Sequence, residues 1–268
     1  MKLAKIIVLS VISMISVSCN MRKEKNKKSI QSSNKIIHKE KKDWSYEGNT
    51  GPEHWDEFEK DSDCGGRYQS PINIISKDVI THNSLNDLDI HYVSKTKIHE
   101  VVNNGHSIQY NFEPGDYISF KGDKYELKQI HFHESSEHTI DGIRYPMAIH
   151  MVHVNDKSQI IVLAVMVKEG NNSAPFEFLE SYLPINKNEH KTINSSFDLN
   201  QNLPNDKGYY HYVGSLTTPP CTEGVNWFIF KNPITISLEQ VKIIQKLMPI
   251  NNYRNEQPLN GRQVNQNK

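Results

Sequence analysis

Residues 160–167 read Ile-Ile-Val-Leu-Ala-Val-Met-Val, an unbroken run of apolar side chains, most of them branched at Cβ. Successive side chains of a strand point to opposite faces, so this run predicts a central strand that is covered on both faces. Other stretches suited to strands and bounded by turn residues are 107–112, 117–120, 128–132, 148–154 and 225–230. Helical patterns are short and span 174–182 and 237–247. Ser237 is placed to cap the start of the second helix, with the Gln240 side chain reaching back to the Ser237 backbone. The sequence therefore predicts a mainly β (α+β) domain with a few short helices.

The composition limits the class of protein. Of the 268 residues, 36% are hydrophobic, and 31 Lys+Arg balance 31 Asp+Glu. This supports a packed core and excludes a wholly disordered chain, a polytopic membrane protein and a collagen-like repeat.

Charge is unevenly distributed along the chain. Residues 1–42 hold eleven bases and two acids, which leaves 20 bases and 29 acids in 43–268. Phosphate binding needs a basic surface, so the acidic body argues against nucleic acid as a partner. Nothing divides 43–268, which we interpret as one domain.

The first 19 residues are typical of a secretory signal peptide. Lys2 and Lys5 form a charged start, and 6–17 is an apolar run that is shorter than the roughly 20 residues of a transmembrane helix. Cys19 follows the apolar run where a lipoprotein signal carries its lipidated cysteine, which predicts a lipid anchor. The alternative is an ordinary secretory signal with an incidental cysteine.

Residues 20–42 are polar, rich in Lys and almost without apolar side chains. Such a segment cannot bury enough surface to fold, so we interpret it as a disordered tether between a membrane and the domain. The alternative is a segment that docks on anionic lipid or on a partner.

The cysteines agree with export to the periplasm or cell surface. With Cys19 lipidated, Cys64 and Cys221 remain as an even pair, and paired cysteines in an oxidising compartment form disulfides. The alternative is two free buried thiols.

Three histidines have the spacing of a metal site. His131 and His133 lie two apart in a predicted strand, so both imidazoles share a face, while Ile130 and Phe132 pack behind them. His150 lies in another predicted strand, and three neutral imidazoles could hold zinc with a fourth position open. With 13 histidines in the chain, the alternative is ordinary buried or surface histidines.

Motifs along almost the whole body resemble the α-class carbonic anhydrases. In chain order they are Trp44-Ser45-Tyr46, Gly51-Pro52-Glu53-His54-Trp55, Gln69-Ser70-Pro71-Ile72-Asn73-Ile74, Asn103-Asn104-Gly105-His106, Gln129-Ile130-His131-Phe132-His133, Ser136-Glu137-His138-Thr139, His150-Met151-Val152-His153, Gly214-Ser215-Leu216-Thr217-Thr218-Pro219-Pro220, Trp227, Gln257-Pro258-Leu259 and Asn260-Gly261-Arg262. The order and spacing make the resemblance specific. It implies a twisted, largely antiparallel central sheet, zinc held by the three histidines, and a Cys64–Cys221 disulfide.

The activity that the resemblance implies is reversible hydration of carbon dioxide to bicarbonate and a proton by a zinc-bound hydroxide. Thr217 matches the residue that orients the hydroxide, Glu137 its proton acceptor, and His106 the proton shuttle. The matched substrate pocket is Val152, Val162, Leu216, Thr218 and Trp227, and further polar cleft positions are Tyr46, Asn104 and Gln109. The oligomeric state is left open between monomer and homodimer.

Ala148 departs from the pattern. At the position two before the third ligand, His150, the family usually has a glutamate whose carboxylate accepts a hydrogen bond from the ring nitrogen that does not bind the metal. An alanine has no side-chain acceptor for this hydrogen bond. Gln129 keeps the equivalent position before His131, and Asn252 matches a second supporting residue. Losing such a partner typically costs 10–100-fold in metal affinity or activity, so we expect weakened zinc retention.

Two other functions compete with the enzyme. A carbonic-anhydrase-like binding module without activity, displayed by the lipid, would usually lack zinc histidines, whereas all three are present here. A zinc esterase would use the same metal, but the narrow apolar wall favours a tiny neutral substrate.

Overall fold

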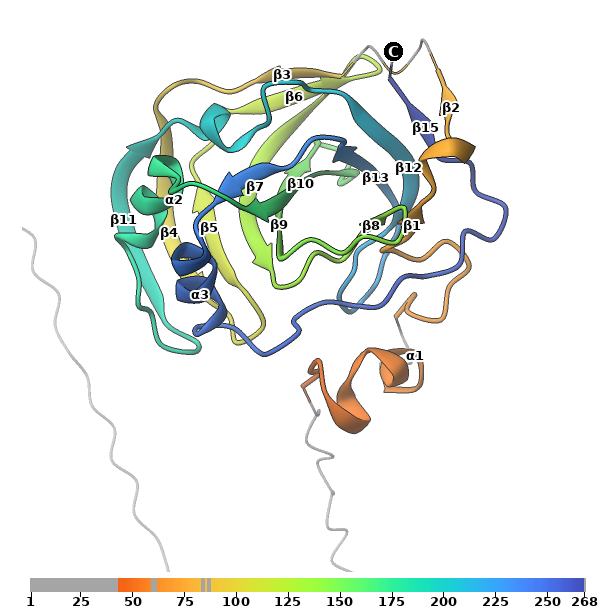
Figure 1. Cartoon of the computed structure of the whole chain (residues 1–268), viewed down its shortest axis with the longest axis horizontal. Coiled ribbons are helices and arrows are strands. Elements are labelled where there is room, and N and C mark those ends of the chain that lie inside the picture. The colour runs from red at the N-terminus through yellow and green to blue at the C-terminus, as the bar shows by residue number, and fades with distance from the viewer. Residues whose placement is uncertain (1–42, 59–61, 83–84, 86–87, 268) are drawn as a thin grey trace, which may run out of the picture. The chain divides into compact units, whose positions relative to one another are not determined.

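The computed structural model describes residues 43–58, 62–82, 85 and 88–267 (Figure 1). The predicted signal peptide 1–19, Cys19 and the tether 20–42 lie outside these residues. No helix in the described ranges has the length and apolar character needed to cross a bilayer.

Strands dominate the described chain: fifteen are found there, of which thirteen belong to one sheet and two form a separate pair. They are β1 (Asn73–Ile74), β2 (Ile80–Thr81), β3 (Asp89–His91), β4 (Thr96–Asn103), β5 (Ile108–Phe112), β6 (Tyr117–Phe120), β7 (Asp123–His133), β8 (Thr139–Ile140), β9 (Met147–Val154), β10 (Ile160–Glu169), β11 (His190–Phe197), β12 (Tyr209–Ser215), β13 (Glu223–Phe230), β14 (Ile234–Ile236) and β15 (Asn265–Gln266). The helices are short: α1 (Trp55–Phe58), α2 (Ala174–Glu180) and α3 (Leu238–Gln245), with single 3₁₀ turns at Gly48–Thr50, Pro52–His54, Ser76–Asp78 and Leu199–Asn202.

The large sheet runs in the order β11-β4-β5-β7-β9-β10-β13-β12-β15-β2. Most neighbours are antiparallel, and the parallel pairs are β10 with β13 and β14, and β15 with β2. β1 and β8 form a separate two-stranded parallel pair. The prediction of a mainly β single domain with a largely antiparallel sheet and few short helices is confirmed.

β10 is the covered central strand that its sequence predicts, since β9 and β13 pair with its two edges. Its odd positions, such as Ile161 and Leu163, join the larger core cluster, which also takes in the apolar side chains of α2 and α3. Its even positions, such as Val162 and Ala164, join a second cluster on the opposite face. Apolar residues at every position are therefore required because both faces of this strand are buried.

Helix α3 begins as predicted. The Ser237 hydroxyl accepts from the Gln240 backbone N–H, and the Gln240 side chain accepts from the Ser237 backbone N–H, which completes a capping box. The Gln240 side chain also exchanges two hydrogen bonds of 2.9 Å with the Ser173 backbone at the start of α2. One side chain thus fixes the starts of both helices.

Cys64 and Cys221 form a disulfide, as expected for an exported protein. The Cys221 N–H donates to the Thr218 carbonyl at 2.8 Å, and the Asp63 N–H donates to the Pro220 carbonyl at 2.9 Å. The bond therefore ties the loop after β12 to the segment that precedes β1.

The two cysteines are separated by 157 positions, so the bond removes a long loop from the unfolded ensemble. We expect a Cys64→Ser/Cys221→Ser variant to lose about 2–5 kcal/mol of unfolding free energy. Urea unfolding of the variant, beside wild type with and without reductant, measures the loss. A midpoint equal to that of the oxidised wild type would contradict the stabilising role.

Candidate metal centre and active site

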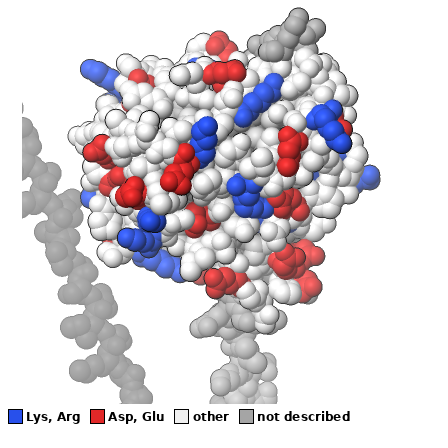
Figure 2. All heavy atoms as spheres, in the orientation of Figure 1, with Lys and Arg blue, Asp and Glu red and all other residues white. Residues whose placement is uncertain are grey.

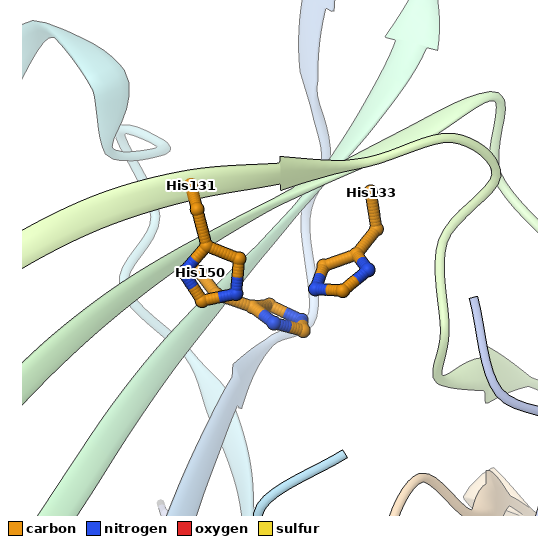
Figure 3. A group of neighbouring side chains, drawn as sticks. All are labelled: His131, His133 and His150. Atoms are coloured by element: carbon orange, nitrogen blue, oxygen red, sulfur yellow. The ribbon is translucent and has the colours of Figure 1, made fainter. Parts of the chain in front are cut away.

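Three imidazoles converge from two neighbouring strands (Figure 3). His131 and His133 come from β7 and His150 from β9, and the antiparallel register places His131 opposite His150. One possible ligand atom from each ring lies within 4.8 Å of the other two. Ile130 and Phe132, on the other face of β7, are fully buried in the larger core cluster. The two-residue period of the strand thus separates the metal face from the core face, as predicted.

Two of the rings are held by hydrogen bonds on their outward nitrogens. His131 Nδ1 lies 2.8 Å from Gln129 Oε1, and His133 Nδ1 lies 2.6 Å from the Asn252 backbone oxygen. Since each outward nitrogen donates to an oxygen, each Nε2 keeps a free lone pair for a metal. Asn252 acts through its backbone, while its side chain donates to the carbonyls of His106 and Phe132.

The third ring is oriented differently. His150 Nδ1 and His133 Nε2 lie 3.8 and 3.5 Å from the same oxygen, Glu137 Oε2, so these two nitrogens face a common point. His150 Nε2 is on the opposite edge of its ring, buried and without a hydrogen-bond partner among the described residues. Ala148 offers it none, as the sequence predicted.

The surroundings favour the neutral form of two of the rings. Burial, followed by the neighbouring imidazoles, holds the pKa of His131 and of His150 well below the usual range. Neutral imidazole is the form that binds zinc. The buried His133 Nε2 has no hydrogen-bond partner within the ranges that the structure describes. Three nitrogen ligands with a fourth position free fit a catalytic zinc site.

Glu137 and Thr217 lie together beside these rings. Glu137 is fully buried, and its Oε1 accepts from the Arg254 N–H at 3.1 Å. Burial raises the pKa of Glu137, and the nearby His133 together with a hydrogen bond to Thr217 opposes that rise. A carboxyl and a hydroxyl are therefore paired next to the metal ligands.

His106 lies at a cleft of about 650 Å³ whose lining also includes Trp44, Tyr46, Asn104 and Lys187. Its ring stacks on Trp44, with centroids 3.7 Å apart and planes inclined by 14°. Burial, then the Lys187 charge, lowers the pKa of His106. The Asn104 side chain accepts from the backbone N–H groups of His106 and Ser107 and so fixes this turn.

An apolar wall adjoins the metal ligands. Val152, Val162 and Trp227 are in register across β9, β10 and β13, and Leu216 packs against the same cluster. The Trp227 ring lies 4.9 Å from the His150 ring, and its Nε1 donates to the Ser215 carbonyl. These side chains form an apolar border on one side of the metal ligands.

The other polar residues expected in the cleft are Thr218, Gln109 and Tyr46. Thr218 is half-buried in the disulfide loop, and Gln109 pairs with His131 in the sheet while its amide donates to Asn111. Burial, then the Glu137 charge, raises the pKa of Tyr46 well above its usual value.

Arg254 is a supporting residue that the sequence reasoning missed. Its guanidinium is buried and donates to the Gln69 side chain and to the carbonyls of Ser70 and Cys64. Because its backbone N–H also binds Glu137, it links the disulfide segment to the site. No local pattern around an isolated arginine could have signalled this role.

Comparison with known proteins gives one consistent result. The sequence model of a family described as eukaryotic-type carbonic anhydrase matches residues 50–268. This chain belongs to the α-class carbonic anhydrases. A Klebsiella pneumoniae carbonic anhydrase is 40% identical over 225 residues, which cover 82% of this chain and 89% of that one.

Solved structures agree with the assignment. An α-carbonic anhydrase from Thermovibrio ammonificans, solved with the inhibitor sulfanilamide, superposes with a TM-score of 0.79 at 40% identity. The match covers 83% of this chain and 98% of that one. The Photobacterium profundum α-carbonic anhydrase superposes with a TM-score of 0.77 at 37% identity, and the match covers 83% of this chain and 100% of that one. The chain is thus a zinc-dependent carbonic anhydrase whose substrates are carbon dioxide and bicarbonate.

The Gln129 hydrogen bond predicts a measurable effect on the metal. Gln129→Leu removes the acceptor that orients His131, and we expect zinc affinity to fall about 10–100-fold. Competition with a chromophoric chelator measures the affinity. Gln109→Leu is the matched control, because its amide contacts Asn111 rather than a ligand. Equal affinities of the Gln129 variant and wild type would contradict the orienting role.

Proposed function

We propose that this carbonic anhydrase hydrates carbon dioxide at the three-histidine centre, with Thr217 and Glu137 orienting the attacking water and His106 relaying its proton. The observation that supports this most strongly is the convergence of three imidazoles beside the buried Glu137–Thr217 pair. When bound, zinc supplies a water whose pKa is lowered to about 7. All three ligands come from one chain, so catalysis requires no second copy.

Thr217 and Glu137 act by positioning. An ionised Glu137 only accepts hydrogen bonds, so the Thr217 hydroxyl donates its proton to that carboxylate. The lone pairs of Thr217 Oγ1 are then left to accept from the attacking water. This fixes the water's remaining lone pair toward the substrate carbon.

The apolar wall sets the substrate. Carbon dioxide has no net charge and no hydrogen to donate, so it binds beside Val152, Val162, Leu216 and Trp227 without leaving a polar group unpaired. An apolar wall beside the histidines favours a small neutral substrate, which favours the hydratase over the zinc esterase. Comparing hydration of carbon dioxide with hydrolysis of an activated ester tests that choice.

His106 moves the proton from the site to bulk solvent. Its half-buried ring is at the cleft, where it can exchange protons with buffer. An imidazole suits this role because it titrates near the pKa of the metal-activated water.

We expect His106→Ala to lower turnover at low buffer concentration, with added imidazole restoring it. Stopped-flow hydration at several buffer concentrations measures both effects. His99→Ala, which removes an exposed histidine from β4, is the matched control. Turnover of the His106 variant equal to that of the control would contradict the relay.

The domain organisation is part of the proposal: signal peptide 1–19 lipidated at Cys19, tether 20–42 and carbonic anhydrase domain 43–268. The enzyme would then be exported and held at a membrane surface, and the Cys64–Cys221 disulfide supports an oxidising compartment. Acids and bases are interspersed over the face in Figure 2, which offers no basic footprint for nucleic acid.

Lipidation has a direct test. We expect metabolic labelling with a radioactive fatty acid to label the full chain and the Cys19→Ser variant to carry no label. An unlabelled wild type would contradict the anchor while leaving export open.

A further inference from the structure

Two buried ring nitrogens next to the metal centre, His138 Nδ1 and His150 Nε2, have no hydrogen-bond partner in the part of the chain that the structure describes. The ring centroids lie 6.3 Å apart, and both rings pack against Trp227 at 4.6 and 4.9 Å. Both side chains are at least 99% buried. We propose that these two nitrogens bind one small anion that only accepts hydrogen bonds, a formate-sized carboxylate or a halide.

His150 Nε2 is a donor when the metal is bound. Its Nδ1 faces the same point as His133 Nε2, so Nδ1 is the nitrogen on the metal side. A neutral imidazole that ligates through Nδ1 carries its proton on Nε2. This N–H then needs an acceptor in a place that water does not reach freely, because an unpaired buried donor is costly.

His138 Nδ1 is a donor as well, because of a chain of hydrogen bonds on its other side. The Ser215 N–H donates to Ser70 Oγ at 3.0 Å, and Ser70 Oγ and the Tyr212 hydroxyl lie 2.7 Å apart. The Tyr212 hydroxyl in turn lies 2.7 Å from His138 Nε2. With one Ser70 lone pair taken by the Ser215 N–H, we assign the Ser70 proton to Tyr212 and the Tyr212 proton to His138 Nε2. That leaves the His138 proton on Nδ1.

Two donors with no acceptor between them select an anion over water. One acceptor atom with two hydrogen bonds of about 2.9 Å can bridge two nitrogens up to about 5.8 Å apart, and the two ring centroids lie 6.3 Å apart. Trp227 beside the two rings and Ala148 on the same face of β9 offer no acceptor, so a water that accepts from both N–H groups would not find a partner there for its own protons. An anion needs no acceptor for itself, and the positive metal next to it favours a negative charge.

None of the carboxylates in the described residues is hydrogen-bonded to these donors. Ala148 precedes His150 by two positions on the same face of β9, and its side chain ends at Cβ. Glu137 is engaged elsewhere, with Oε1 on the Arg254 N–H and Oε2 facing His133 Nε2. A bound anion would therefore orient His150 as Gln129 and the Asn252 carbonyl orient the other ligands.

Diffraction tests the site directly. Crystals of the zinc-loaded protein are soaked in sodium bromide or in sodium formate, and bromide is located by its anomalous signal. We expect the anion within hydrogen-bond distance of both His138 Nδ1 and His150 Nε2, and the two soaks show whether halide or carboxylate occupies it. A water there in both soaks, or anions at the zinc alone, would overturn the proposal.

Zinc release to excess chelator tests the consequence in solution. We expect saturating formate to slow release from wild type about 10-fold, the lower end for an oriented ligand. Ala148→Glu brings its own carboxylate and should release zinc slowly with or without formate. Ala148→Val, which adds bulk without an acceptor, should lose the formate effect.

These variants separate the new site from the metal. If formate slowed zinc release equally in wild type and in Ala148→Val, formate would be acting on the zinc, which would overturn the proposal. A release rate from wild type that formate does not change would overturn it as well. The inference relies on the zinc centre of the proposed function, but the two fail differently. Zinc retained with no carbon dioxide hydration would count against the function, whereas hydration without an anion at His138 would count against this site alone.

Discussion

The pairing register of β7 with β9 is the constraint on which the rest of the site depends. It sets His131 opposite His150, and the period of the strand adds His133 to the same face. A slip by one residue would turn a whole strand over and send its imidazoles into the apolar core. β10 prevents that slip, because its two faces are packed into two different core clusters and its edge holds β9 along eight residue pairs.

Segments far apart in sequence complete what the strands begin. The Asn252 carbonyl orients His133, the Arg254 N–H binds Glu137, and the disulfide holds the loop that carries Thr217. Each adds a polar group to a buried place, and each is hydrogen-bonded there, which is what makes such burial tolerable. His138 Nδ1 and His150 Nε2 lack such partners among the described residues, and this is the basis for the proposed anion site.

Strands with a regular apolar pattern can be predicted from the sequence. Elements and residue roles that depend on tertiary contacts cannot. The run in β10 and the Ser237–Gln240 capping box are local signals, and both are found as expected. β4 was missed because a bulge between Ile98 and Glu100 breaks its alternation. The metal histidines follow from strand period and family resemblance together. The roles of Arg254 and of His138 could not be predicted, since they arise from hydrogen bonds across long sequence separations.

The central claim is that one zinc ion, held by His131, His133 and His150, makes this chain a carbonic anhydrase. Stopped-flow hydration of carbon dioxide by metal-stripped protein, titrated with zinc, tests it most directly. The account predicts no hydration without metal, a linear rise in rate, and a plateau at one zinc per chain. Full metal binding without hydration, or a rate independent of zinc, would contradict it.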